Sequence, residues 1–196
     1  MNEWLWGLGG VAVGVVLVHG LGYLTALARW FKRRCSCLGA TFTLTPAETT
    51  ALIAMLNRAL ADEWFAFYQY WIGAHVVAGS LAMSVIAELR EHAEQEFEHA
   101  GLLVERIKQL GGTPLLDPAE WAIVSNCGYL APRDYDSKPV LEQNVQGEIC
   151  AISSYTSLLE FLNGRHAVTA GDVTFILAQE EEHKRDLQGL LTKLGK

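Results

Sequence analysis

The chain contains 196 residues, of which 51% are hydrophobic and 19% are charged, and its formal net charge is −7. This balance is typical of one helical domain with an additional apolar segment. The acidic charge argues against sequence-independent binding of nucleic acid, which needs a basic surface. Four cysteines are too few and too scattered for a secreted disulfide scaffold.

The additional apolar segment lies near the N-terminus. Residues 5–27 contain no charged side chain, and a helix of this length is about 34 Å long, enough to cross a bilayer. Basic residues follow the apolar run, whereas a signal peptide carries them before it. We therefore predict a transmembrane anchor with its basic flank over residues 1–34, followed by a linker over residues 35–44. The positive-inside rule then places the N-terminus outside and the rest of the chain in the cytoplasm.

Residues 45–196 are predicted to form a bundle of four long helices. Thr45 is a good N-cap, Pro46 suits the first helical position, and Glu48 completes a capping box. The first helix then runs to about residue 77. The others are expected over residues 81–110, over residues 139–162, and from a cap at Thr169 or Asp172 to residue 194.

A long segment separates the second and third predicted helices. Residues 112–137 contain three prolines and are too many for a simple hairpin turn. We therefore expect this segment to run back along the bundle as a crossover. The fold class predicted is all-α: a four-helix bundle with one long crossover, preceded by a single transmembrane helix.

Two short motifs carry the chemistry. In each, a glutamate stands three residues before a histidine, which places both side chains on one helix face. Each motif is preceded by a single glutamate one long helix earlier, at offsets of 33 and 32 residues. Two glutamates and two Glu-x-x-His pairs from four helices are the ligand set of a dinuclear carboxylate metal site. The predicted ligands are Glu63, Glu96, His99, Glu148, Glu180 and His183.

Two tyrosines repeat the same symmetry. Tyr70 and Tyr155 each follow a predicted ligand glutamate by seven residues, which is nearly two helical turns, so each shares that glutamate's face. The chain therefore resembles a duplicated helix hairpin. We expect both phenols near the metals, as hydrogen-bond or electron donors. His92 lies one heptad before His99, and we interpret it as a core residue or a support for a ligand.

With these residues in place, residues 45–194 resemble the bacterioferritin and Dps-like branch of the ferritin-like superfamily. The likeness is densest in Glu63 through Gln69-Tyr70, in Glu96-x-x-His99-Ala100 with Glu105-Arg106-Ile107 and Gly112-x-Pro114, and in Glu180-Glu181-x-His183. The resemblance implies a dimetal centre of two Fe, or Mn, with Glu96 and Glu180 bridging. No haem is expected, because Phe97 occupies the position of the haem-binding methionine. Gln95 and Gln179 replace acidic residues that support the histidines in the family, and an amide oxygen can still accept a ring N–H.

The cysteines of the bundle resemble those of the thioferritins. That family places a cysteine pair near its dimetal site, and Cys127 and Cys150 occupy similar positions here. Cys150 stands two residues after Glu148, so its side chain should point toward the crossover and away from the metals. A redox-active disulfide and two buried thiols acting as small hydrophobic side chains both remain open.

The function predicted from these features is a membrane-anchored diiron protein. It would oxidise Fe²⁺ with H₂O₂ or O₂, act as an oxidoreductase of ferroxidase or peroxidase type, and limit peroxide and iron toxicity. A homodimer or larger homo-oligomer is expected, without nucleic acid as a partner. Two alternatives remain: a diiron oxidase or oxygenase that acts on a membrane-associated substrate through an open apolar channel, and a non-catalytic accessory subunit of a membrane complex.

Overall fold

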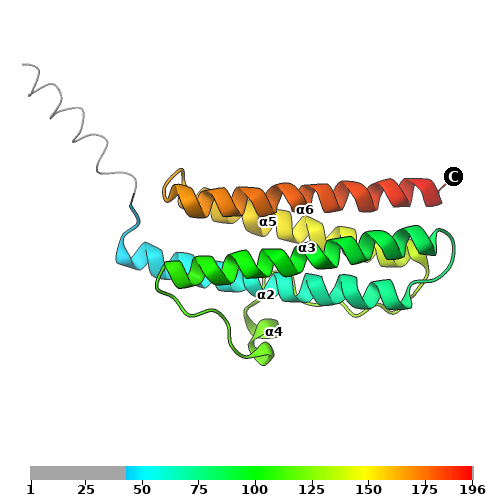
Figure 1. Ribbon diagram of the computed structural model, residues 1–196, viewed down its shortest axis with the longest axis horizontal. Coiled ribbons are helices and arrows are strands. Elements are labelled where there is room, and N and C mark those ends of the chain that lie inside the picture. The colour runs from blue at the N-terminus through cyan, green and yellow to red at the C-terminus, as the bar shows by residue number, and fades with distance from the viewer. Residues whose placement is uncertain (1–42, 196) are drawn as a thin grey trace, which may run out of the picture. The chain divides into compact units, whose positions relative to one another are not determined.

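The computed structural model describes residues 43–195, which form an all-helical bundle without strands in this part of the chain. Its four long helices are α2 (Pro46–Val76), α3 (Ala82–Gln109), α5 (Ser137–Leu162) and α6 (Ala167–Leu194). Helices α2 and α3 form one hairpin, and α5 and α6 form the second (Figure 1). The four helices and the duplicated hairpin predicted from the sequence are thereby confirmed.

The predicted start of the first bundle helix is confirmed in detail. The backbone N–H of Glu48 donates to Oγ1 of Thr45 at 3.2 Å, and the backbone N–H of Thr45 donates to Oε2 of Glu48 at 2.8 Å. These two bonds satisfy backbone donors that the first helical turn would otherwise leave without a partner. Glu48 also accepts from Nη1 of Arg165 at 2.6 Å, so the start of α2 is tied to the connection between α5 and α6.

The predicted cap of the last helix is wrong. Helix α6 begins at Ala167, and its N-cap is His166 in the left-handed region, so neither Thr169 nor Asp172 caps it. Thr169 is instead fully buried in the first turn, where its hydroxyl lies 2.8 Å from Nδ1 of His166. Asp172 accepts from Nε of Arg106 at 2.7 Å. Tertiary contacts therefore use both polar side chains, and the helix starts earlier.

The segment between α3 and α5 is the predicted crossover. It contains the short helices η1 (Pro118–Glu120) and α4 (Trp121–Val124), and Figure 1 shows it passing beside α2 to reach the far end of the bundle. At that end, the backbone N–H of Ala78 donates to the carbonyl of Tyr135, and that of Ser137 donates to the carbonyl of Ala78. The crossover therefore spans the length of the bundle and lets α5 begin at the end opposite to the one where α3 ends, as in ferritin-like bundles.

The apolar core consists of two clusters separated along the bundle. One cluster includes Leu60, Leu103 and Ile176, and the other includes Leu89 and Leu187. On each long helix, a buried glutamate lies between residues of the first cluster and residues of the second. The fold thus places four carboxyl groups at one level of the bundle, with apolar layers on both sides.

The predicted membrane anchor over residues 5–27 lies outside the described residues. Within residues 43–195, no helix is long and apolar enough to cross a membrane. The physical reason is visible in α3, which buries an apolar stripe but exposes Glu91, Glu94 and Glu98 on its other face. Such a helix belongs at the boundary between a protein core and water.

Replacing Glu48 tests the contact between α2 and Arg165. The hydrogen bond from Arg165, followed by those from Thr45, lowers the pKa of Glu48 from its ordinary 4.5 to about 2. Because this pKa is lower in the folded chain, the carboxylate stabilises the fold above about pH 4.5, and this contribution is lost as the pH falls toward 2. We expect Glu48→Gln to lower the melting temperature at pH 7, with the difference from wild type shrinking toward pH 3.

Circular dichroism melts across this pH range provide the measurement. Glu142→Gln is the matched control, since Glu142 is exposed and lies 3.8 Å from Lys138 within α5. A melting difference for Glu48→Gln that is no larger than that of the control, or that grows on acidification, would contradict the assignment.

Candidate metal centre

All six predicted ligands meet in the middle of the bundle. Helix α2 supplies one glutamate, α5 supplies another, and α3 and α6 each supply a glutamate and a histidine one turn apart. Each of the six side chains is at most 2% exposed: Glu63, Glu96, His99, Glu148, Glu180 and His183. The structure therefore brings together the complete set that the spacing of the motifs predicted.

The six side chains form two overlapping groups. The first is Glu63, Glu96, His99 and Glu180, and the second is Glu96, Glu148, Glu180 and His183; within each group, one potential ligand atom per residue lies within 4.8 Å of the others. Glu96 and Glu180 belong to both groups. This arrangement offers two adjacent cation positions, each with one imidazole and one carboxylate of its own and with two carboxylates in common.

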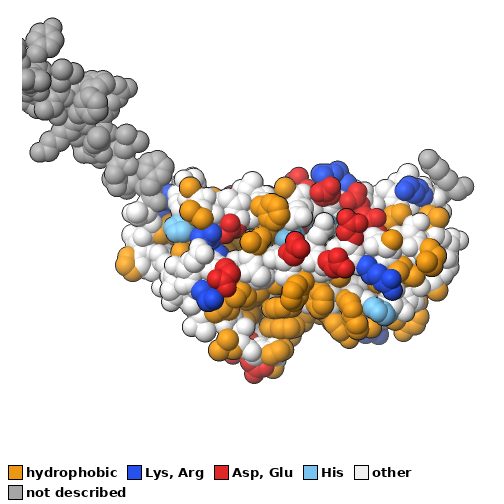
Figure 2. All heavy atoms as spheres, viewed as in Figure 1, with side chains coloured by type: hydrophobic (Ala, Val, Ile, Leu, Met, Phe, Trp, Pro, Cys, Tyr) orange, Lys and Arg blue, Asp and Glu red, His pale blue; other side chains and the backbone are white. Residues whose placement is uncertain are grey.

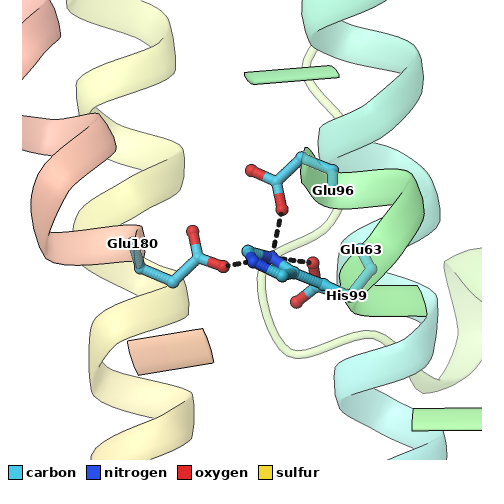
Figure 3. Close-up of side chains that lie close together, drawn as sticks. All are labelled: Glu63, Glu96, His99 and Glu180. Atoms are coloured by element: carbon cyan, nitrogen blue, oxygen red, sulfur yellow. Dashed lines mark hydrogen bonds and ion pairs between the residues drawn. The ribbon is translucent and has the colours of Figure 1, made fainter. Parts of the chain in front are cut away.

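The first group surrounds one imidazole nitrogen. Nδ1 of His99 lies 3.0 Å from Oε2 of Glu96, 3.1 Å from Oε1 of Glu180 and 3.3 Å from Oε2 of Glu63. Figure 3 shows these three carboxylates converging on the ring from three different helices. In the second group, Nδ1 of His183 lies 3.2 Å from Oε1 of Glu96 and 3.5 Å from Oε2 of Glu180.

The outward nitrogens of both histidines contact glutamines. Nε2 of His99 lies 2.8 Å from Oε1 of Gln179, and Nε2 of His183 lies 2.7 Å from Oε1 of Gln95. An amide oxygen only accepts, so each Nε2 donates its proton to a glutamine, and each Nδ1 is the ring nitrogen that faces the carboxylates. The prediction that these glutamines replace the family's acidic supports is thus consistent with the contacts. Each glutamine serves the histidine of the other motif.

The two tyrosines also make their hydrogen bonds across the two hairpins. The hydroxyl of Tyr70 donates to Oε1 of Glu148, and the hydroxyl of Tyr155 donates to Oε1 of Glu63. Each phenol therefore holds a carboxylate of the opposite hairpin. Because one oxygen of each carboxylate accepts from a tyrosine, the second oxygen is left for the centre.

The donor set fits a pair of cations. Oε1 of Glu96, Oε2 of Glu148, Oε1 of Glu180 and Nδ1 of His183 are buried atoms without a hydrogen-bond partner among the described residues. Buried polar atoms normally have partners, and several orphans at one point indicate a missing ligand. Nδ1 atoms of two histidines and oxygens of four carboxylates all face that point, and this set of atoms can coordinate cations.

Electrostatics supports the same interpretation. Burial, followed by the charges of Glu96 and Glu180, raises the pKa values of Glu63 and Glu148 well above the ordinary range. Burial alone would lower the pKa of His183, but the nearby carboxylates of Glu180 and Glu96 outweigh burial and raise that pKa to about 9. Four carboxylates can share one desolvated space as anions only when positive charge lies among them.

One further residue, Asp62, fixes the crossover against α2, and the sequence motifs do not identify it. Its Oδ1 accepts from the backbone N–H groups of Asn126 and Cys127 at 2.8 and 2.9 Å, and its Oδ2 accepts from the Asn126 side chain at 2.7 Å. The side chain is only 6% exposed. Its position among apolar residues just before Glu63 is the one sign of a buried role in the sequence. The sequence could not identify its partner Asn126, which lies 64 residues away.

The two cysteines form a disulfide between the crossover and α5. Cys127 and Cys150 are joined, with their Cα atoms 5.7 Å apart. The prediction that Cys150 faces the crossover is therefore confirmed, and the alternative of two free thiols does not describe this state. Beside the disulfide, a cavity of about 40 Å³ is lined by Cys127 and Gly128 at one side and by Glu63, Glu96, Glu148 and Glu180 at the other.

A four-helix bundle with one long crossover and a buried carboxylate–imidazole centre is typical of ferritin-like proteins. Known proteins similar to this chain belong to the same class. Residues 53–196 match the model of the ferritin-like domain. The chain is also 30% identical over 151 residues to the DNA protection during starvation protein of Pyrococcus furiosus, an alignment that spans 76% of this chain and 80% of that protein. The chain therefore belongs to the ferritin-like domain family.

Solved structures give the same fold. The bacterioferritin-related protein of Bacteroides fragilis, described as a dodecameric thioferritin, is 42% identical, with a TM-score of 0.75 over 84% of this chain and 95% of that one. A ferritin-like diiron-carboxylate protein of Bacillus anthracis is 27% identical, with a TM-score of 0.64 over 76% and 99%. Dps of Thermosynechococcus elongatus, at 20% identity and a TM-score of 0.70 over 74% and 92%, shares the fold.

The location predicted from the sequence, a single-pass membrane protein with its bundle in the cytoplasm, is wrong. The chain is similar to a DNA protection during starvation protein and to Dps, and the described residues contain no helix that could cross a membrane. The prediction relied on the length and apolarity of residues 5–27 and on the basic residues that follow them. These features satisfy the dimensions of a bilayer and the positive-inside rule but do not establish a location.

Removing the disulfide should weaken the fold. The bond closes a loop between residues that are 23 apart, and a crosslink of this span stabilises a protein by about 2–4 kcal/mol, chiefly by restricting the unfolded chain. We expect Cys127→Ser to lower the free energy of unfolding in urea by that amount. Wild type in dithiothreitol should behave like the variant, and the variant should not respond to dithiothreitol. Equal stability of oxidised and reduced wild type would contradict the disulfide's structural role.

Proposed function

We propose that the protein is a ferritin-like diiron oxidoreductase that oxidises Fe²⁺ with H₂O₂ or O₂ and so limits iron and peroxide toxicity. The observation that carries this proposal is the pair of overlapping donor groups, which share Glu96 and Glu180. In it, Glu63 and His99 would hold one iron ion, Glu148 and His183 would hold the other, and the shared glutamates would bridge them.

The ligand types favour iron over zinc. Each position offers three carboxylates and one imidazole, and hard oxygen ligands with one borderline nitrogen suit Fe or Mn. Structural and catalytic zinc sites usually use four ligands that are richer in nitrogen or sulfur. Four carboxylates also balance the charge of two divalent ions, which supports a dinuclear centre rather than a single cation.

The size of the cavity favours a small oxidant. A volume of about 40 Å³ holds roughly three water-sized molecules, which suits H₂O₂ or O₂ but not a quinone or another large organic substrate. The oxygenase alternative expected an open apolar channel. Apolar residues such as Phe65, Ala66 and Ala151 line this cavity together with the carboxylates, so only its small volume argues against a large substrate.

With H₂O₂ as the oxidant, two Fe²⁺ ions would each give up one electron and become Fe³⁺. The two electrons would reduce one H₂O₂, which takes up two protons and yields two molecules of water. The chain's own contribution is positioning. Tyr70 and Tyr155 orient Glu148 and Glu63 by donating to their outer oxygens, and Gln95 and Gln179 fix the histidine tautomers. Groups held in this way need little rearrangement when ions bind and change charge.

The relatives support the same role. The Pyrococcus furiosus relative is named as a DNA protection during starvation protein, and the Bacillus anthracis structure is described as a diiron-carboxylate protein. The disulfide beside the cavity is compatible with an additional redox role for Cys127 and Cys150, which would then act next to the centre rather than as ligands.

We also propose that the chain forms a homo-oligomer. The Bacteroides fragilis relative is dodecameric, and this chain exposes apolar side chains that suit an interface: Phe97 is 57% exposed and contacts Trp64 and Phe67. Figure 2 shows hydrophobic side chains gathered below α3, over α2 and α4. Exposed apolar patches of this kind usually mark contacts between proteins.

Removing a terminal ligand should damage the centre. We expect wild type to bind about two iron ions per chain and Glu148→Ala to bind about one, by elemental analysis. Stopped-flow absorbance after adding H₂O₂ to the Fe²⁺-loaded variant should show oxidation slowed by more than about 100-fold. The loss of a residue that supports a ligand typically lowers metal affinity or activity by about 10–100-fold, and the loss of a ligand itself should have a larger effect.

Glu182→Ala is the matched control, since Glu182 is exposed on α6 only two residues after Glu180. It should keep both the metal content and the rate. Oxidation that is unchanged in Glu148→Ala would refute the proposed function, and a metal content near zero in wild type would favour the accessory-subunit alternative.

Placing a charge at Phe97 should disrupt the proposed assembly. We expect Phe97→Glu to give a smaller particle than wild type in size-exclusion chromatography with light scattering, because burying an unpaired carboxylate in an interface is costly. Phe97→Leu keeps the apolar surface and should assemble normally. Identical particle sizes for Phe97→Glu and wild type would show that this surface is not an interface.

A further inference from the structure

A third group of potential metal ligands lies beside the centre on the seam between α3 and α6. It consists of Glu88 and His92 on α3 and Asp186 on α6, with one potential ligand atom from each lying within 4.8 Å of the others. None of these residues belongs to the two groups described above. The three come from two helices that the fold brings together, so no local sequence pattern accounts for their meeting.

His92 is the unusual member of this group. Its side chain is only 2% exposed, and its Nδ1 has no hydrogen-bond partner among the described residues. Its Nε2 points to Oε1 of Glu88 at 3.4 Å. Buried imidazoles normally satisfy their nitrogens with donors, acceptors or metals. Nε2, rather than the unpartnered Nδ1, therefore faces the cluster, and it is the ring atom that a cation there would use.

The two carboxylates have no lysine or arginine partner. Within residues 43–195, the one ion-pair contact of Glu88 is with His92, and Asp186 forms none. They nevertheless approach each other closely enough to share one cluster. Two like charges held together next to an imidazole are favourable when a cation joins them.

We propose that Glu88, His92 and Asp186 form a third divalent-cation site, separate from the dinuclear centre. One imidazole and two carboxylates are borderline and hard ligands, suited to Fe²⁺, Mn²⁺ or Co²⁺, with water completing the coordination. The site binds more weakly than the centre and exchanges its ion with solvent, because Asp186 is exposed and Glu88 is partly exposed.

The position of this site relates it to the centre. The rings of His92 and His183 stack with centroids 4.1 Å apart and planes inclined by 25°. A cation held by His92 is therefore one imidazole ring away from a proposed ligand of the dinuclear centre. Figure 2 shows acidic side chains gathered over α3 and α6, the two helices that supply the site, and such charges attract cations from solution.

Cobalt binding to the metal-free full-length protein tests the proposal. Titration followed by calorimetry and visible absorbance should give two tight Co²⁺ ions and one weaker ion per wild-type chain. His92→Ala and Asp186→Asn should each weaken the third ion by at least about tenfold and leave the two tight ions in place. Asp186→Asn is the critical variant, since Asp186 is exposed and its replacement does not disturb the core. Glu91→Gln, which removes an equal exposed charge next to His92, should retain all three ions.

Crystals soaked in Co²⁺ would locate the ions by anomalous scattering, with the third peak expected between His92 and Asp186. Glu63→Ala should lose an ion from the centre and keep this third ion, so failure of the proposed function and failure of the third site are distinguishable. The proposal would be overturned by a wild type that binds no third ion, by an anomalous peak elsewhere, or by an Asp186→Asn variant that binds three ions as tightly as Glu91→Gln does.

Discussion

The bundle depends on one electrostatic constraint: four carboxyl groups share a buried space between two apolar clusters. Burial of this kind is unfavourable for charged groups unless positive charge or hydrogen-bond donors compensate it. The apolar layers on both sides therefore make the centre a candidate site for cations. The same layers raise the pKa values of Glu63 and Glu148, so the features that stabilise the core also define its chemistry.

The supporting contacts of the centre all cross between the two hairpins. Tyr70 on α2 holds Glu148 on α5, while Tyr155 on α5 holds Glu63 on α2. Gln95 and Gln179 likewise contact the histidine of the opposite motif. Neither hairpin can complete a cation position alone, since each position uses carboxylates from both. Each group is therefore complete only when the two hairpins pack together.

The crossover contributes a wall to this arrangement as well as a connection. Asp62 binds its backbone beside Glu63, and the disulfide joins it to α5 two residues after Glu148. Two covalent or hydrogen-bonded anchors thus hold the loop over the small cavity. Because Asp62 and Cys150 stand close to Glu63 and Glu148 in the chain, the crossover is fixed against the helices that carry two of the four carboxylates.

The sequence by itself determined the helices, the crossover and all six residues of the centre, because helical periodicity and the Glu-x-x-His spacing are local properties of the chain. It did not determine the start of α6, where Thr169 is buried and Asp172 pairs with Arg106, or the location of the protein. Only the tertiary structure decided which tyrosine and glutamine serve which ligand, and only it placed Asp186 beside His92. These pairs join residues far apart in the chain, and no local pattern encodes which face of one helix meets another.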